Sequence, residues 1–218
     1  MASEVKTNKL SPSTGVTVTL GDASDVFQLP ASAEIDIASG ATLDVNGTID
    51  LTGATKTGFP AGGLTDASQW RLTTDFTGDV APIATNLEEA DTYGAGTLGS
   101  SMTQSSGIFT FPSTGYWLVR FHADFQAGVA HGSLYNEVEL RTTLDNGATL
   151  YNSAAMTSVG LTAANHWSGA ETELIFDVTD TTLCKCRFDI NVEQVDVITK
   201  GNTGKNETFF TFIKLADT

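Results

Sequence analysis

The sequence has few positive charges and few signals for helices. Its 218 residues include 11 lysines and arginines against 26 aspartates and glutamates, a formal net charge of −15 at pH 7. A surface with this balance repels the phosphates of DNA and RNA, so nucleic-acid binding is disfavoured. Gly, Ser, Thr, Asp and Asn interrupt the chain every few residues, and residues 86–90 are the one short helix that we expect.

Long hydrophobic runs are also missing. No apolar run reaches the roughly 18 residues that a membrane-spanning helix needs. The first ten residues, MASEVKTNKL, lack the apolar segment of a secretory signal. We therefore expect a protein that is made in a host cytoplasm, without a signal peptide, and that does not insert into a membrane. The hydrophobic content of 40% is enough to form a core.

Cysteine is scarce, and the two cysteines, Cys184 and Cys186, stand one residue apart. In a strand both side chains point to the same face as Phe188 and Ile190. Two ligands alone bind a metal weakly. A disulfide between them is disfavoured, because their Cα atoms would lie about 6.6 Å apart in an extended chain. We predict reduced, buried thiols that act as small apolar side chains.

Common catalytic signals are lacking as well. The three histidines, His122, His131 and His166, belong to no H-E-x-x-H motif, and the chain has no G-x-S-x-G, P-loop or dinucleotide-binding motif. We therefore expect a protein that is not an enzyme, with no catalytic residues, no metal and no cofactor.

What the sequence does contain is an alternating pattern over residues 33–53, where an aspartate flanked by two aliphatic residues occurs three times. The apolar edge is too small to be buried by one chain, so we expect identical copies to bury it in a trimeric β-shaft over residues 31–57. The three aspartates could face solvent as charged residues or bind calcium. We favour the first interpretation, because they are isolated from one another and calcium needs several oxygen ligands at one place. The predicted shaft packing residues are Ile35, Ile37, Leu43, Val45, Ile49 and Leu51.

A hinge rich in glycine and proline follows at residues 58–65, and the composition then changes. Residues 66–218 contain all the tryptophans and tyrosines, and turn signals separate eight candidate strands. This pattern predicts an all-β fold, an antiparallel jelly-roll sandwich. The candidate strands are residues 69–74, 107–112, 116–125, 134–144, 149–152, 171–178, 183–195 and 208–215.

Two of these strands indicate where the core and a subunit contact lie. In residues 116–125 the odd positions, from Trp117 to Phe125, form a strongly apolar face. Residues 208–215 carry aromatic side chains on both faces. An antiparallel strand that is apolar on both faces needs a second burial surface, which a homotrimer supplies. The predicted contact and core residues are Tyr116, Leu118, Phe210 and Phe212.

The segment GIFTFPSTGY, residues 107–116, resembles the Gly-x-Phe-x-x-Pro-x-x-Gly stretch of complement one-q and tumour-necrosis-factor-like heads, with the family's tyrosine at Tyr116. The ending FTFIKL, residues 210–215, resembles the closing strand of that family, and residues 143–147 approach its Asn-Gly turn. Thr211 departs from the family pattern, where a glycine is usual. The resemblance covers residues 66–218 and implies a trimeric, ten-stranded jelly roll.

The N-terminal layout is similar to that of small structural proteins of tailed bacteriophages from marine and cyanobacterial hosts. It begins SEVKTNKLSPSTG and continues with TLGDASDVFQLP and short Gly/Thr-rich strands. This resemblance implies a virion protein, a trimeric tail fibre or spike. Residues 1–30 would attach to other virion proteins, and the head would bind a host-surface glycan or protein. The alternatives are a capsid decoration or cement protein or head fibre that stabilises the shell, and a soluble, lectin-like trimeric recognition head.

The loop at residues 161–169 is the candidate ligand site of the head. His166 and Trp167 lie there among small polar residues, and a Trp ring can stack on a sugar while a His hydrogen-bonds to it. The alternative is that Trp167 packs under a loop or at the subunit contact. The same two interpretations apply to Tyr93 and Tyr135.

Overall fold

The computed structural model describes residues 37–46 and 63–218. The chain divides into two compact units, Met1–Thr57 and Gly58–Thr218. Residues 37–46 contain a turn in which the Ala41 N–H donates to the Ala38 carbonyl (2.9 Å), and no strand forms within this stretch.

The predicted shaft falls in the first unit. Ile37, Leu43 and Val45 are exposed in the single chain. The other shaft residues, Ile35, Ile49 and Leu51, and the predicted attachment segment 1–30 lie outside the described residues. The shaft, which concerns three copies, therefore stays a prediction.

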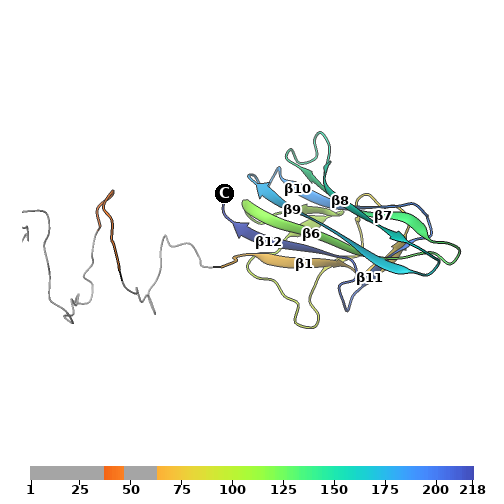
Figure 1. The fold of residues 1–218 in the computed structure, drawn as a ribbon. Helices are drawn as coiled ribbons and strands as arrows, with labels where there is room; N and C mark the ends of the chain where they lie inside the picture. Colours follow the sequence, from red (N-terminus) through yellow and green to blue (C-terminus); the bar gives the residue numbers. More distant parts are fainter. Residues whose placement is uncertain (1–36, 47–62) are drawn as a thin grey trace, which may run out of the picture. The chain divides into compact units, whose positions relative to one another are not determined.

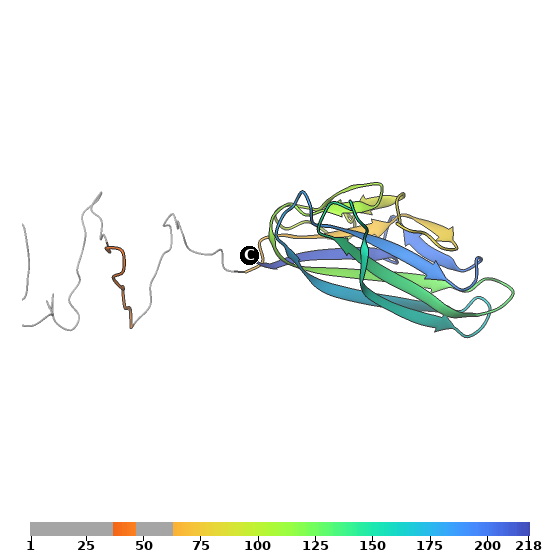
Figure 2. The same cartoon turned by 90° about the horizontal axis from the view of Figure 1, so that it is seen from above.

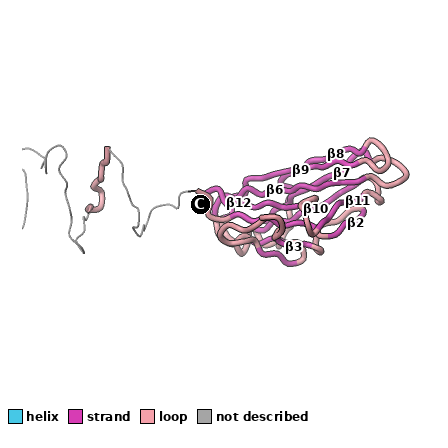
Figure 3. Tube along the Cα trace, turned by 90° about the horizontal axis from the view of Figure 1, so that it is seen from below, coloured by secondary structure: helices cyan, strands magenta, loops and turns pink. Residues whose placement is uncertain are grey.

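The second unit is built from strands and loops alone over residues 63–218 (Figures 1 and 3). No helix in the described part of the chain is long and apolar enough to cross a membrane. The strands are β1 (Ala67–Leu72), β2 (Thr74–Thr77), β3 (Leu87–Glu89), β4 (Thr103–Ser105), β5 (Ile108–Thr110), β6 (Gly115–Gln126), β7 (Ser133–Thr143), β8 (Asn152–Leu161), β9 (Trp167–Val178), β10 (Lys185–Val192), β11 (Ile198–Asn202) and β12 (Phe209–Ala216).

The strands form two antiparallel sheets that pack as two layers (Figure 2). The seven-stranded sheet has the order β2-β11-β6-β12-β1-β3, and β9 pairs with the other edge of β6. The five-stranded sheet has the order β4-β5-β10-β7-β8. Sequence neighbours are often distant in this order, since β6 pairs with β9 and β12. This arrangement confirms the predicted jelly-roll sandwich.

The core lies between the two sheets and is rich in aromatic rings. β6 alternates, and its odd positions from Trp117 to Phe125 are buried, which confirms the predicted core face. The opposite sheet contributes Phe188 on β10, whose ring lies 4.3 Å, centroid to centroid, from that of Phe210 on β12. Strict alternation along a strand brings these side chains to one side, so one core holds both layers together.

Both cysteines are buried free thiols, as predicted. Cys186 points into the core from β10, next to Phe188 in the alternation. Complete burial raises the pKa of the Cys186 thiol far above its ordinary value, because the apolar core disfavours the thiolate. The thiol therefore stays protonated at neutral pH and is inert.

The helix predicted at residues 86–90 is wrong. Asn86 has a positive φ of 58°, and the following residues form the short strand β3 along the edge of β1, where Trp70 lies opposite Glu89. The left-handed conformation at Asn86 does not continue into a helix, and pairing with β1 satisfies the backbone instead.

Three other differences concern strand boundaries and short strands. The strand predicted at 149–152 is β8, which runs from Asn152 to Leu161. The strand predicted to start at residue 171 begins at Trp167. Three further short strands, β2, β4 and β11, were not expected. β8 lacks a strong apolar alternation because its residues are mostly small and polar.

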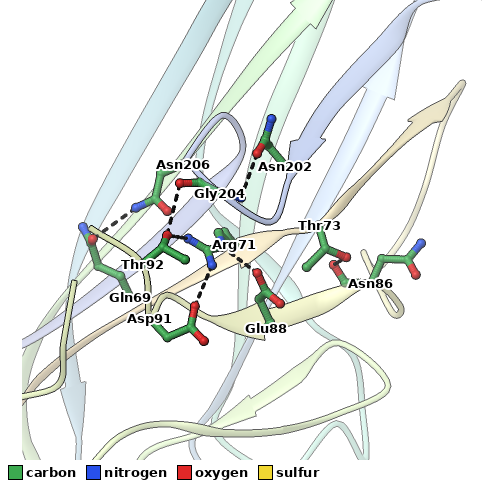
Figure 4. A network of polar contacts seen from close by, with 10 residues as sticks. All are labelled: Gln69, Arg71, Thr73, Asn86, Glu88, Asp91, Thr92, Asn202, Gly204 and Asn206. Carbon is green, nitrogen blue, oxygen red and sulfur yellow. Dashed lines mark hydrogen bonds and ion pairs between the residues drawn. The ribbon is translucent and has the colours of Figure 1, made fainter. Parts of the chain in front are cut away.

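A buried charge holds two surface loops against the seven-stranded sheet (Figure 4). Arg71 on β1 is 1% exposed. Its guanidinium donates to Glu88 Oε1 (2.7 Å), Asp91 Oδ1 (2.8 Å) and Thr92 Oγ1 (2.8 Å). The Thr92 hydroxyl in turn donates to the Gly204 carbonyl at 3.1 Å. One arginine therefore joins the loop after β3 to the loop between β11 and β12.

Candidate functional site: a subunit interface

The outward face of the seven-stranded sheet carries a row of apolar side chains across three strands. Leu118 on β6 lies opposite Ile175 on β9 on one side and opposite Ile213 on β12 on the other. Ile175 is 61% exposed, and Leu118 and Ile213 are half-buried. Tyr116, on the same face of β6, is also exposed. We call Ile175, Leu118 and Ile213 the apolar row.

A charged belt lies next to the apolar row on the same face. Arg120 on β6 contacts two carboxylates of β9, with 3.6 Å between its Nε and Glu171 Oε1 and 3.0 Å between its Nη2 and Glu173 Oε2. His122 Nε2 lies 3.1 Å from Asp124 Oδ1. These pairs are solvent-accessible, so they contribute little stability to one chain. Their alternating signs suit recognition of a second surface.

The His122 ring also stacks on Phe209 of β12, with 5.1 Å between ring centroids and 27° between the planes. Phe209 is half-buried, so an aromatic side chain remains partly open to solvent beside the belt. The belt therefore has apolar neighbours on two sides, the apolar row next to Arg120 and Phe209 beside His122. Such a mixture of charged and apolar side chains is typical of protein interfaces.

A second surface is the side of the sandwich formed by β8 and β9. Each strand pairs on one edge only, β8 with β7 and β9 with β6, and the two strands lie against each other (Figure 1). Their inward side chains Val159 and Leu174 pack on the core but are only half-buried, and Met156 is exposed. The chain does not fully cover its own core at this side.

These two surfaces differ in shape and position, since one is a sheet face and the other a sheet edge. A contact that joins unlike surfaces is heterologous and closes into a ring when the rotation between copies allows it. The apolar row and the β8–β9 side can therefore mediate self-association, which requires no chemical reaction.

The predicted contact residues are divided by the structure. Tyr116 and Leu118 lie on the outward face, where a second copy can reach them. Phe210 and Phe212 are 0% exposed in the single chain and belong to its own core, so their placement in a subunit contact is wrong. β12 is apolar on both faces as expected, but the face that turns outward carries Phe209, Thr211 and Ile213.

The sequence interpretation missed Ile175 and Ile213. Both could have been found by alternation once the inward face was assigned, because Phe176 and Phe212 are their buried neighbours. The signal was ambiguous, since each of these strands offers apolar residues on both faces.

The predicted ligand residues His166 and Trp167 lie at the start of β9. Trp167 is 54% exposed, and the amine of Lys200 lies 5.1 Å from its ring centroid. His166 Nδ1 instead lies 2.8 Å from Thr162 Oγ1 in the preceding loop. One face of the indole therefore has a cation beside it, and the imidazole is directed to its own loop. A sugar site at these residues stays a prediction.

Over residues 37–46 and 63–218, no three His, Cys, Asp or Glu side chains are placed to hold a metal ion. Of the three aspartates in the predicted shaft, only Asp44 is described, and it is exposed.

No protein-family model matches the chain, and no curated protein matches it. Among solved structures, murine APRIL at pH 5.0 is 10% identical with a TM-score of 0.50, over 69% of this chain and 98% of that chain. Eiger TNF from S. frugiperda is 14% identical with a TM-score of 0.50, over 72% of this chain and 96% of that chain. Identities this low show a shared fold alone. The second unit has a tumour-necrosis-factor-like jelly-roll fold, as the sequence resemblance implied.

Proposed function

We propose that the protein is a non-enzymatic homotrimer in which the β8–β9 side of one copy docks on the apolar row of the next. The observation that carries this proposal is the outward-facing apolar row, which runs from Ile175 on the edge strand β9 across Leu118 on β6 to Ile213 on β12. Covering this apolar surface with another copy removes it from water, which stabilises the assembly. The complement one-q and tumour-necrosis-factor-like heads that the sequence resembles are trimers, which supports the same number of copies.

Sedimentation of the full-length protein tests this proposal. We expect a species with three times the 22.9 kDa chain mass at micromolar concentration. Leu118→Glu places a carboxylate in the contact and shifts the species to monomer, because a buried unpaired charge costs several kcal/mol. Val195→Glu is the matched control, since Val195 is 84% exposed in the loop between β10 and β11, away from the row and from the β8–β9 side. A monomeric wild type, or a trimeric Leu118→Glu variant, contradicts the proposal.

We further propose that the trimer is a virion structural protein, a tail fibre or spike. In this arrangement the N-terminal segment docks on other virion proteins and the head faces outward to bind a host-surface glycan or protein. The layout of residues 1–57, similar to that of phage structural proteins, supports this role. Three heads on one fibre add avidity to a weak single contact.

Cryo-electron microscopy of the native particle separates this role from its alternatives. Density for a jelly-roll trimer projecting from the tail supports a fibre or spike. Density at a symmetry position on the shell, clamping neighbouring capsid subunits, supports a decoration protein or head fibre instead. A protein found free, with no particle-bound density, supports a soluble recognition head.

A further inference from the structure

Three aliphatic side chains protrude at one end of the head. Val129 is 84% exposed, Leu134 83% and Val195 84%. They belong to the loop after β6, the start of β7 and the loop between β10 and β11. This end lies opposite the C-terminus, because Ala216 lies beside Tyr116 at the start of β6 and the loop after β6 leaves from its other end (Figure 1). We call the surface around these side chains the distal tip.

The loops of the distal tip are packed against one another. The Leu134 N–H donates to Glu193 Oε2 (2.5 Å), and the Glu193 N–H donates to the Tyr135 carbonyl (3.1 Å). The backbone at Gly128 lies so close to the Asp196 carboxylate that an added Cβ would clash with it. These contacts between the loops therefore hold the protruding aliphatic residues close to one another.

A β-bulge turns two consecutive apolar residues outward at the start of β7. The register between β7 and β8 shifts between Ser133 and Asn136. Both of these polar residues are buried, with 3.0 Å between Ser133 Oγ and Asn136 Oδ1 and 2.9 Å between Asn136 Nδ2 and the Val159 carbonyl. The bulge leaves both Leu134 and Tyr135 exposed, where a regular strand would turn one of them inward.

An open groove of about 460 Å³ adjoins Leu134. Its wall is the paired backbone of β7 and β8, where two glycines let the chain segments approach closely: an added Cβ at Gly132 would clash with the Leu161 carbonyl, and one at Gly160 would lie 3.1 Å from the Leu134 carbonyl. The lining residues are Gly132, Ser133, Leu134, Gly160, Leu161 and Thr162. A groove of this composition suits one apolar side chain of a partner.

Three carboxylates lie at the distal tip, together with His131 in the loop after β6. Asp79, Glu193 and Asp196 surround the protruding residues, and none forms an ion pair with any residue in the described part of the head. The ion-paired lysines and arginines of the head bind carboxylates elsewhere. Two copies of this tip would repel each other, so tip-to-tip pairing does not fit. A partner with positive charge does.

We propose that the distal tip is a docking surface for a partner protein through a segment that combines apolar and basic side chains. An apolar side chain enters the groove beside Leu134, Val129 and Val195 cover its neighbours, and lysine or arginine faces Glu193 and Asp196. The inference rests on the proposed outward display of the head, and it names the surface and the chemistry of the partner.

An array of immobilised synthetic 12-residue peptides tests the proposal with labelled full-length protein. The array holds three classes of matched length: apolar and basic, apolar and acidic, and basic without apolar residues. We expect selective binding to the first class, weakened by 0.5 M NaCl because the carboxylates are exposed to screening. For a selected peptide, the Leu134→Ser/Val195→Ser double variant binds about tenfold or more weakly, since two apolar contacts are lost. Glu193→Gln/Asp196→Asn lowers both the affinity and its salt dependence.

Leu144→Ser is the matched control, because it removes an exposed leucine away from the tip and leaves peptide binding unchanged. Binding to no class, equal binding to acidic and basic peptides, or an unchanged double variant overturns the proposal. Selective binding of the distal tip to a glycan array instead overturns the choice of a protein partner. Sedimentation of each variant separates the two proposals: monomeric protein that still binds peptide through the tip contradicts the trimer and leaves the docking surface intact.

Discussion

Arg71 shows how one buried side chain organises the surface of this protein. Its three hydrogen bonds reach acceptors on β3 and on the loop that follows, and Thr92 continues the connection to Gly204 (Figure 4). A guanidinium suits this position because its donors lie in a planar fork. The partner carboxylates Glu88 and Asp91 keep contact with water, which lowers the cost of burying the charge.

We predict that Arg71→Met lowers the free energy of unfolding by about 2–3 kcal/mol, because charge-assisted bonds are lost while apolar packing is partly kept. Urea unfolding of the full-length protein measures the change. Lys205→Ala is the control, since Lys205 is 66% exposed in its pair with Glu207 and little change is expected. An Arg71→Met variant as stable as the wild type would show that the network contributes no net stability.

Asp145 gives the fold a pH dependence on the acid side. Its carboxylate accepts hydrogen bonds from Thr143 Oγ1 (2.6 Å) and Thr149 Oγ1 (2.5 Å), which lower the pKa of Asp145. Because the folded pKa lies below the unfolded value of about 3.9, the ionised group stabilises the fold above that pH. This stabilisation is lost as the pH falls through the folded pKa.

We therefore predict that Asp145→Asn destabilises the protein at pH 7 and that the difference from the wild type shrinks as the pH falls below about 4. Urea unfolding curves of both proteins at pH 7 and pH 3 make the comparison. A difference that is the same at both pH values would exclude a role for the ionised carboxylate.

Two adjacent residues of strand β12 face opposite sides of the sheet, one toward the core and the other toward the candidate interface. Phe212 is buried between the sheets, and Ile213 faces outward in the apolar row. Both residues are apolar, so composition alone does not tell which one another copy contacts. The pairing of β12 between β6 and β1 settles the direction of each side chain.

We predict opposite outcomes for the two neighbouring substitutions. Phe212→Ala removes a ring from the core and lowers the free energy of unfolding by about 3–5 kcal/mol. Ile213→Asp leaves the fold intact, because the carboxylate meets solvent in the free chain, and it weakens trimer formation. Circular dichroism during urea unfolding and sedimentation velocity measure the two effects. A folded, fully trimeric Ile213→Asp protein would exclude Ile213 from the contact.

The strands that the sequence predicted well are those with a strong and one-sided alternation. β6 has large apolar residues on its core face and a polar end on the other, so its span and its buried side were predicted correctly. β8 could not be predicted in this way, because neither face of its Ser, Ala and Gly-rich span is strongly apolar and it forms through pairing with β7. The helix prediction at β3 is wrong because the pairing of this strand with β1 is not local and leaves no signal in the nearby sequence.

On the scale of the whole molecule, trimer formation couples folding to concentration. If the β8–β9 side and the apolar row are covered only in the assembly, the melting temperature rises with chain concentration by mass action. We predict a higher melting temperature for the full-length protein at 100 µM than at 1 µM, measured by differential scanning calorimetry. The Leu118→Glu variant, designed as a monomer, loses this dependence. A wild-type melting temperature that does not change with concentration would indicate a chain that is complete as a monomer.

Sequence patterns alone predict the all-β class, the jelly-roll sandwich of the second unit, the core face of residues 117–125 and the buried, reduced cysteines. Alternation and turn residues are local, so they can be read along the chain. The folded chain, in contrast, is needed to see that Phe210 and Phe212 lie inside, that Ile175, Leu118 and Ile213 form one row, and that Leu134 and Val195 protrude at the same tip. Each of these depends on which distant strands pair and in which register, and a strand with two apolar faces leaves that choice to its neighbours.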